Sequence, residues 1–171
     1  MRIAAVLLAL AAPVAFSANG VSEEFASGFG GVRWGVDFAA LMARFPGGYE
    51  EFSTAPGRIS YSLNIEDSVL GISRPGQRVV YGMGVDGTVD VIEIHVAYEQ
   101  TSVLLSTMES RFGPAKSVDI EGVVTIYRWP PDHGMTVSVR TTKSAAYGLT
   151  ALTLGRLSRV AVRRRSGDKS T

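Results

Sequence analysis

Cysteine is absent from all 171 residues of the chain, and this absence excludes several kinds of chemistry at once. A chain without thiols carries no disulfide, no thiolate metal site, no cysteine nucleophile and no lipid-modified cysteine. Histidine is also scarce, since only His95 and His133 occur. The sequence has no H-x-x-x-H pair, no calcium loop and no G-x-S-x-G turn around a serine. We therefore expect a protein that is not an enzyme and that binds no cofactor and no metal.

The acidic residues also lack a clear catalytic arrangement. They occur as adjacent pairs at Glu23-Glu24, Glu50-Glu51 and Glu66-Asp67. Neighbours on an extended chain point to opposite faces, so the two carboxylates of such a pair do not converge. We interpret His95 as a surface residue opposite Arg78, and His133 as a polar loop residue after Asp132. The alternative is a hydrolase that uses carboxylates, which would require two acidic groups to converge in a closed pocket.

No apolar run reaches the roughly 20 residues that a membrane-spanning helix needs. The run at residues 3–12 follows a single arginine, Arg2, and is followed by Pro13 and small residues. This order is typical of a secretory signal peptide. We expect residues 1–20 to be a signal peptide, cleaved after Ser17 or after Gly20, and the mature protein to be periplasmic or secreted. The mature chain is then expected to contain no transmembrane segment.

The net charge of +1 hides two regions of opposite sign. Residues 21–155 carry ten basic and fifteen acidic side chains, whereas residues 156–171 carry six basic and one acidic. We interpret residues 21–155 as a single α+β domain and residues 156–171 as a basic, disordered tail. The tail either keeps the protein soluble or binds an anionic envelope surface. Nucleic acid is not an expected partner of an exported protein.

Two segments have the apolar periodicity of a short helix. Residues 101–113 carry a stripe at Leu105, Met108 and Phe112. The same spacing occurs earlier at Phe38, Leu41 and Phe45. Both stripes end in Arg-Phe followed by Gly and Pro, which stop helices, and Asp37 and Thr101 are the expected N-caps. The recurrence predicts that the domain consists of two related halves.

The other patterned segments predict strands. The expected strands are residues 29–34, 61–65, 69–72, 78–86, 88–98, 116–120, 123–129, 135–141 and 149–154. Asp86-Gly87 predicts a two-residue type I′ turn, with Val79 opposite Ile94, and a second hairpin places Tyr127 opposite Val137. Long hairpins between two helices indicate an antiparallel sheet with both helices packed on one face, and the recurring stripe predicts a pseudo-repeat.

A group of three glycines, at positions 28, 30 and 31, precedes the first expected strand. A phosphate-binding loop places its glycines after a strand and before a helix. Because the order here is reversed, we interpret the glycines as a flexible lead into that strand.

If both helices cover one face of the sheet, the other face is free to bind. Alternation along the strands brings apolar and polar side chains to it, which is the mixed composition of protein interfaces. The residues that we predict to form an interaction surface are Arg78, His95, Ile126, Arg128 and Arg140. The hypothesis is an exported binding protein that contacts an envelope protein through this face, with the basic tail adding electrostatic attraction. A structural envelope protein that oligomerises through an edge strand is a further alternative, and the sequence leaves the oligomeric state open.

Several short motifs resemble those of a known group of proteins. They are the segment FGGVRWG at residues 29–35, the helix ending RFGPA at residues 111–115, and a later strand that ends at Trp129. Together they resemble small exported bacterial domains, among them outer-membrane assembly lipoproteins of the SmpA/OmlA kind and the β-lactamase-inhibitor fold, which is built from two α/β repeats. The likeness covers about residues 29–154. It implies a non-enzymatic role through protein contacts on the sheet, although this chain lacks the lipidated cysteine of the lipoproteins.

Overall fold

The computed structural model describes residues 20–52, 59–143 and 148–156. Its elements in chain order are α1 (Val21–Glu24), α2 (Phe38–Arg44), β1 (Tyr49–Phe52), β2 (Ile59–Asn64), β3 (Arg78–Met83), β4 (Val89–Val96), a 3-10 turn (Tyr98–Gln100), α3 (Thr101–Phe112), β5 (Ser117–Glu121), β6 (Val124–Arg128), β7 (Met135–Thr142) and β8 (Leu149–Arg156). Residues 1–19 of the expected signal peptide and residues 157–171 of the basic tail lie outside the described residues.

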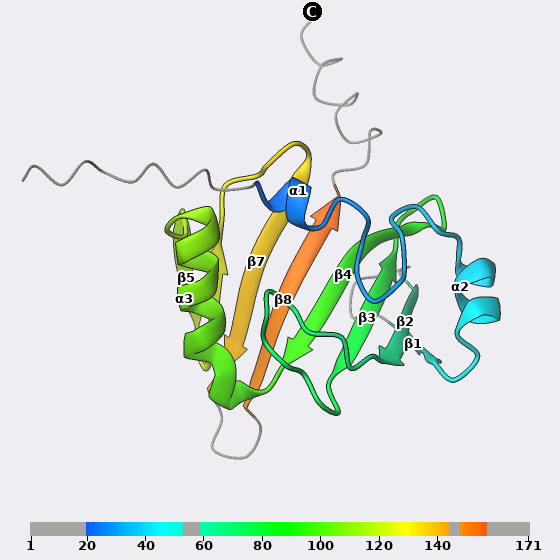
Figure 1. Cartoon of the computed structure of the whole chain (residues 1–171), viewed down its shortest axis with the longest axis horizontal. Helices are drawn as coiled ribbons and strands as arrows, with labels where there is room; N and C mark the ends of the chain where they lie inside the picture. Colours follow the sequence, from blue (N-terminus) through cyan, green and yellow to red (C-terminus); the bar gives the residue numbers. More distant parts are fainter. Residues whose placement is uncertain (1–19, 53–58, 144–147, 157–171) are drawn as a thin grey trace, which may run out of the picture.

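The eight strands form one antiparallel sheet in the order β1-β2-β3-β4-β8-β7-β6-β5 (Figure 1). This arrangement confirms the predicted α+β fold class. Helices α2 and α3 are each followed by four strands, and the two four-stranded units join side by side where β4 pairs with β8. The repeated element order agrees with the two related halves that the apolar stripes predicted.

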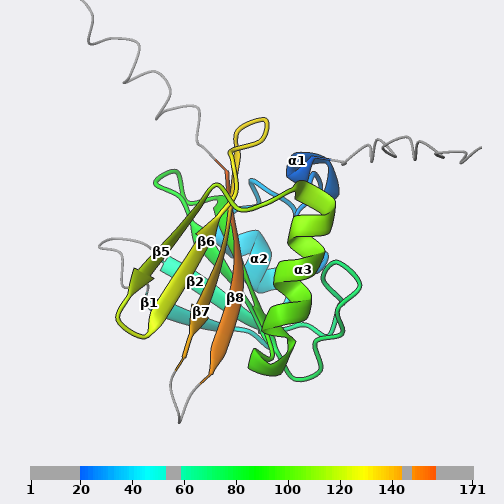
Figure 2. The same cartoon turned by 90° about the vertical axis from the view of Figure 1, so that its left-hand side faces the viewer.

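The helices lie on one face of the sheet, as Figures 1 and 2 show. In α2 the Asp37 carboxylate caps the helix by accepting a hydrogen bond of 2.8 Å from the backbone N–H of Ala40, as predicted. Phe38 packs edge-on against Tyr61, with ring centroids 5.8 Å apart, and Leu41 is buried. Neither α2 nor α3 is long enough to be stable alone, so burial against the sheet holds them.

The expected N-cap of α3 is wrong. Gln100 occupies that position because the 3-10 turn runs directly into the helix. The Thr101 hydroxyl instead donates to the carbonyl of Tyr98 and lies 2.5 Å from the hydroxyl of Thr150 on β8. At the other end Gly113 terminates the helix with φ of 79°, as its sequence position predicted.

The buried side of α3 is also turned slightly from the predicted stripe. Leu104 and Met108 are completely buried, whereas Leu105 and Phe112 are only partly buried. The most deeply buried side chains of the helix are therefore four residues apart, about one turn, and Leu105 and Phe112 pack beside them.

The pairing of β3 with β4 confirms the predicted register, with Val79 opposite Ile94. In the second hairpin Tyr127 lies opposite Val139 and not Val137. The chain makes an additional tight turn between Asp132 and Met135, which lengthens the connection. The predicted register is therefore shifted by two residues. Because side chains alternate between the faces with a period of two, every side chain stays on the face predicted for it.

The turn between β3 and β4 differs from the predicted type I′ turn. The Gly87 N–H donates to the carbonyl of Gly84, and the Gly84 N–H donates to the carbonyl of Thr88. Gly87 has φ of 75°, whereas Asp86 does not adopt a positive φ. This is a type I turn closed by a glycine bulge. The Asp86 carboxylate stabilises it by accepting hydrogen bonds from the backbone N–H and the hydroxyl of Thr88.

Two expected strands are wrong and one strand was missed. Residues 29–34 and 69–72 form tight turns, each closed by a single pair of facing residues, Phe29 with Val32 and Val69 with Ile72. In such a turn too few residues remain extended to join the sheet. The missed strand is β1, whose sequence YEEF lacks apolar alternation and which forms by pairing with β2.

Arg74 lies within the apolar core and is completely buried. Its guanidinium donates to four backbone carbonyls, those of Ile65, Asp67, Arg78 and His95, at 2.6 to 3.3 Å. The guanidinium carbon also lies 5.4 Å from the centroid of the Phe29 ring. Burial lowers the pKa of Arg74, because desolvation disfavours the charged form. Arg74 thus joins the loop before β3 to β3 and β4.

Candidate functional site

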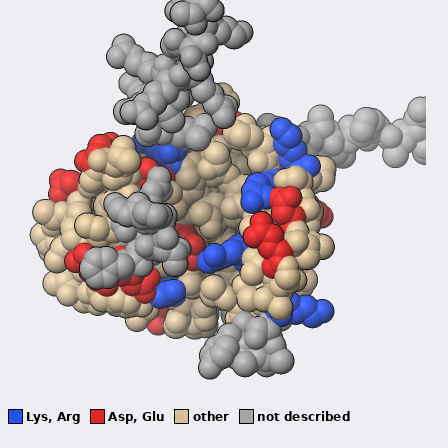
Figure 3. Space-filling model, turned by 180° about the vertical axis from the view of Figure 1, so that it is seen from behind, with Lys and Arg blue, Asp and Glu red and all other residues tan. Residues whose placement is uncertain are grey.

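The candidate site is the open face, which we define as the face of the sheet opposite α1, α2 and α3. Figure 3 views the molecule from this side and shows a hollow in its middle, with basic and acidic side chains on its floor and flanks. A cross-strand row on the open face runs from His95 on β4 through Ala151 on β8 and Arg140 on β7 to Ile126 on β6. Arg78 of β3 contacts His95 at the other end of this row.

The next row runs in the same direction across the sheet. In it Arg128 of β6 lies opposite Ser138 of β7, and Thr153 of β8 lies between Ser138 and Glu93 of β4. All five residues predicted for the interaction surface therefore lie on the open face, in two adjacent rows. The third row contains Gly82, Val91, Gly155 and Thr136.

The hollow follows from the size of the side chains on the central strands. The two strands at the centre of the open face, β7 and β8, present mainly small residues, namely Thr136, Ser138, Ala151, Thr153 and Gly155. Longer side chains stand on either side of them, with Arg78 toward one edge of the sheet and Arg128 toward the other. The short side chains leave room above the sheet that a protruding segment of another molecule can fill.

An electrostatic network crosses the open face. Arg78 pairs with Glu51 of β1 at 2.5 Å, and its Nε lies 3.4 Å from Nδ1 of His95. The other ring nitrogen of His95 lies 2.8 Å from the Glu93 carboxylate, and that carboxylate lies 3.6 Å from the guanidinium of Arg140. The network therefore links β1, β3, β4 and β7, and it fixes the direction in which the arginines point.

A separate ion pair between Arg128 and Asp119 joins β6 to the edge strand β5 on the same face. The side chains of Arg78, Arg128 and Arg140 keep 38 to 46% of their surface exposed. Part of each arginine side chain is therefore accessible from solvent.

The interpretation of His95 as a surface residue is wrong. Its side chain is only 4% exposed although it lies on the open face. Its two ring nitrogens lie against Arg78 and Glu93. We conclude that His95 positions its two charged neighbours.

His133 belongs to a second polar cluster that joins α1 to the loop between β6 and β7. The Asp132 carboxylate accepts hydrogen bonds from the hydroxyl of Ser22 at 2.7 Å and from its backbone N–H at 2.9 Å, and it lies 2.6 Å from Nδ1 of His133. A catalytic triad requires the histidine to contact the acid and the serine through different nitrogens. Here the same Nδ1 lies nearest to both, and His133 is 86% exposed in its loop. The cluster anchors α1.

The pKa of Glu93 is held below its usual value of 4.5, mainly because it accepts a hydrogen bond from His95, with further support from Arg140 and Arg78. A depressed carboxyl pKa stabilises the fold above the unfolded-state pKa, and this contribution disappears as the pH falls through the lower folded-state pKa. We predict that the wild-type protein loses stability more steeply than Glu93→Gln as the pH falls from about 5 to about 3. Urea unfolding at several pH values measures this, and parallel pH profiles would contradict the prediction.

Sequence reasoning missed the acidic half of the site, namely Glu51, Glu93 and Asp119. Glu51 was missed because β1 was not recognised as a strand. Alternation along the strand already assigned Glu93 to the same face as Arg78 and His95, although Glu93 was not among the five predicted residues, and alternation could also have identified Asp119.

Within residues 20–52, 59–143 and 148–156 no three histidine or acidic side chains come together in a way that could hold a metal ion. No helix in these ranges is long and apolar enough to cross a membrane. Comparison with family models, with curated proteins and with solved structures finds no match to this chain. The resemblance to exported α/β-repeat domains therefore stays a prediction, and function has to be argued from the surface itself.

Proposed function

We propose that this chain is an exported, non-enzymatic binding protein of the bacterial envelope that contacts a partner protein through its open face. The observation that carries this proposal is the balance of charge around the hollow. Three arginines, Arg78, Arg128 and Arg140, stand beside three carboxylates, Glu51, Glu93 and Asp119. A uniformly anionic partner, such as a lipid surface, would meet as much repulsion as attraction there. A protein segment can match both signs.

The composition of the open face also favours a protein partner. Interfaces between proteins are enriched in arginine and depleted in lysine, and none of the eight strands contains a lysine. Partly buried apolar side chains, Val80, Val91, Val124 and Ile126, alternate with the charged ones. Hydroxyl groups on the central strands supply neutral donors and acceptors for a backbone segment lying in the hollow.

Site-specific photo-crosslinking tests this proposal. A photoreactive amino acid at Ser138, at the centre of the open face, is expected to crosslink one discrete envelope protein. Combining it with Arg128→Gln and Arg140→Gln should lower the yield about tenfold, because truncating a central interface arginine costs roughly 1 to 2 kcal/mol. We choose glutamine because glutamate at position 140 would stand next to Glu93 and repel it.

The matched control carries the same photoreactive group at Ser102, which is exposed on α3 on the opposite side of the sheet. It is expected to give no discrete product. Equal crosslinking from both positions, or an unchanged yield in the double variant, would contradict the proposal. Circular dichroism establishes that the variants are folded, which is expected because both arginines are nearly half exposed.

The rival interpretation, a hydrolase, requires two converging carboxylates in a closed pocket. A cavity in the described part of the chain is open to solvent, and its lining includes one acidic residue, Asp67. That cavity lies on the other side of the sheet, among the loops beside α2.

A further inference from the structure

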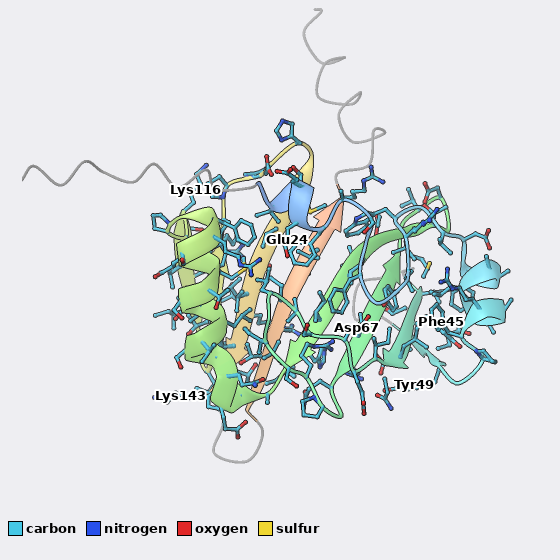
Figure 4. All side chains as sticks on the ribbon, in the orientation of Figure 1. Glu24, Phe45, Tyr49, Asp67, Lys116 and Lys143 are labelled. Carbon is cyan, nitrogen blue, oxygen red and sulfur yellow. The ribbon has the colours of Figure 1, made fainter. Side chains whose placement is uncertain are left out.

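A cavity of about 500 Å³ lies on the helix-bearing side of the molecule, away from the open face. Its lining consists of Ser27, Gly28, Phe29, Gly30, Gly31, Val32, Arg33, Arg44, Asp67 and Ser68. Three segments that are distant in the sequence meet there. They are the turn that contains Gly30 and Gly31, which we call the glycine-rich turn, the last turn of α2, and the loop between β2 and β3. In Figure 4 the labelled Asp67 and Phe45 mark the latter two segments. A volume of this size accommodates a small organic ligand.

The glycine-rich turn is a built element and not the flexible lead expected from the sequence. Gly30 and Gly31 both adopt left-handed conformations, with φ of 61° and 76°, in a two-residue turn closed by hydrogen bonds between Phe29 and Val32. The Tyr81 hydroxyl holds the turn by donating to the carbonyl of Phe29 at 3.0 Å. A side chain at Gly30 would collide with this hydroxyl and with Ile65. In the described part of the chain neither glycine N–H donates to a backbone carbonyl.

Two arginines on the cavity wall have no acidic partner within the described ranges. Within the described ranges, neither Arg33 nor Arg44 forms an ion pair, and the guanidinium of Arg44 lies over the Phe45 ring, 5.4 Å from its centroid. Ser27 and Ser68 add hydroxyl groups. Guanidinium groups, hydroxyls and free backbone N–H groups together form the donor set that recognises a phosphate.

Asp67 makes the cavity selective. Its backbone carbonyl is occupied by Arg74, whereas its carboxylate stands on the cavity wall. A carboxylate there repels a bare anion but accepts hydrogen bonds from hydroxyl groups next to an anionic group. Two arginines from separate segments also suit the several oxygens of a phosphate better than the two of a carboxylate.

We propose that this cavity binds the phosphate ester of a polyol, with Arg33 and Arg44 contacting the phosphate and Asp67 accepting hydrogen bonds from the neighbouring hydroxyls. The site lies outside the open face, so it does not depend on the proposed partner-binding function. A phosphate ester of this kind occurs free in solution or as the headgroup of a lipid, and the experiment distinguishes these sources.

The probe is glycerol 3-phosphate, titrated into the purified protein by calorimetry and by amide NMR. Binding is expected to shift the amide signals of Gly30 and Gly31. Arg33→Gln and Arg44→Gln should each weaken binding about tenfold. The control is Lys143→Gln, which removes the same unit of charge far from the cavity and should bind as the wild type does (Figure 4). All three side chains are exposed, so the variants should fold.

Asp67→Asn tests selectivity. It should strengthen binding of inorganic phosphate and reduce the preference for glycerol 3-phosphate over inorganic phosphate about fivefold, the worth of one hydrogen bond. In a second experiment the protein is mixed with vesicles that do or do not contain phosphatidylglycerol. If the vesicles with this lipid retain the wild-type protein but not Arg44→Gln, the ligand is a lipid headgroup. No binding of glycerol 3-phosphate at millimolar concentration, equal binding by the arginine variants, or signal shifts confined to other residues would overturn the proposal.

Discussion

Arg74→Met is expected to lower the free energy of unfolding by about 4 kcal/mol, a large part of the roughly 5 to 15 kcal/mol that stabilises a domain. Arg74 is completely buried, and its N–H groups are the donors for four carbonyls that belong to β3, β4 and the loop before them. Methionine fills similar space but donates no hydrogen bond. Each carbonyl left without a donor costs about 1 to 3 kcal/mol, which outweighs the relief of removing a buried charge.

Denaturant unfolding followed by circular dichroism measures this loss. The matched control is Arg111→Met on α3, an exposed arginine whose only described ion pair, with Glu24, spans 3.3 Å. That control should change stability by less than about 1 kcal/mol, because exposed ion pairs contribute little. Arg74→Lys should recover only part of the loss, since an ammonium has three donors and not the five of a guanidinium. Equal stability of Arg74→Met and Arg111→Met would show that Arg74 is not a structural anchor.

Leu104→Ala is expected to cost about 3 kcal/mol, in the middle of the range for a completely buried leucine. Leu104 and Met108 are the two completely buried side chains of α3. Because α3 depends on this contact for its helical state, the loss should also appear as weaker protection of its amides from hydrogen exchange.

The control on the same helix is Val103→Ala. Val103 is 51% exposed, so its truncation should change the free energy of unfolding by less than about 0.5 kcal/mol. A comparable loss in both variants would contradict the assignment of Leu104 as the buried contact of α3. Leucine and alanine are both good helix formers, so propensity alone predicts almost no change at position 104.

The parts of this fold that follow from local pattern were predictable. Asp37 is a helix cap because a carboxylate before an apolar stripe satisfies the first free N–H groups, whatever lies elsewhere in the chain. The alternation along β3, β4, β6 and β7 decided which side chains share a face, and it remained right when the second register was off by two residues. All five residues predicted for the interaction surface share the open face for this reason.

What only the tertiary structure decided concerns groups that meet across long stretches of chain. The four carbonyls that Arg74 binds, the partners that bury His95, and the arginines and Asp67 around the glycine-rich cavity come from different strands and loops. Alternation and capping act over a few residues, whereas burial and ion pairing depend on how strands are ordered in the sheet. The sequence by itself determined the faces of this protein, and the packing of strands and loops in the folded sheet decided which side chains meet.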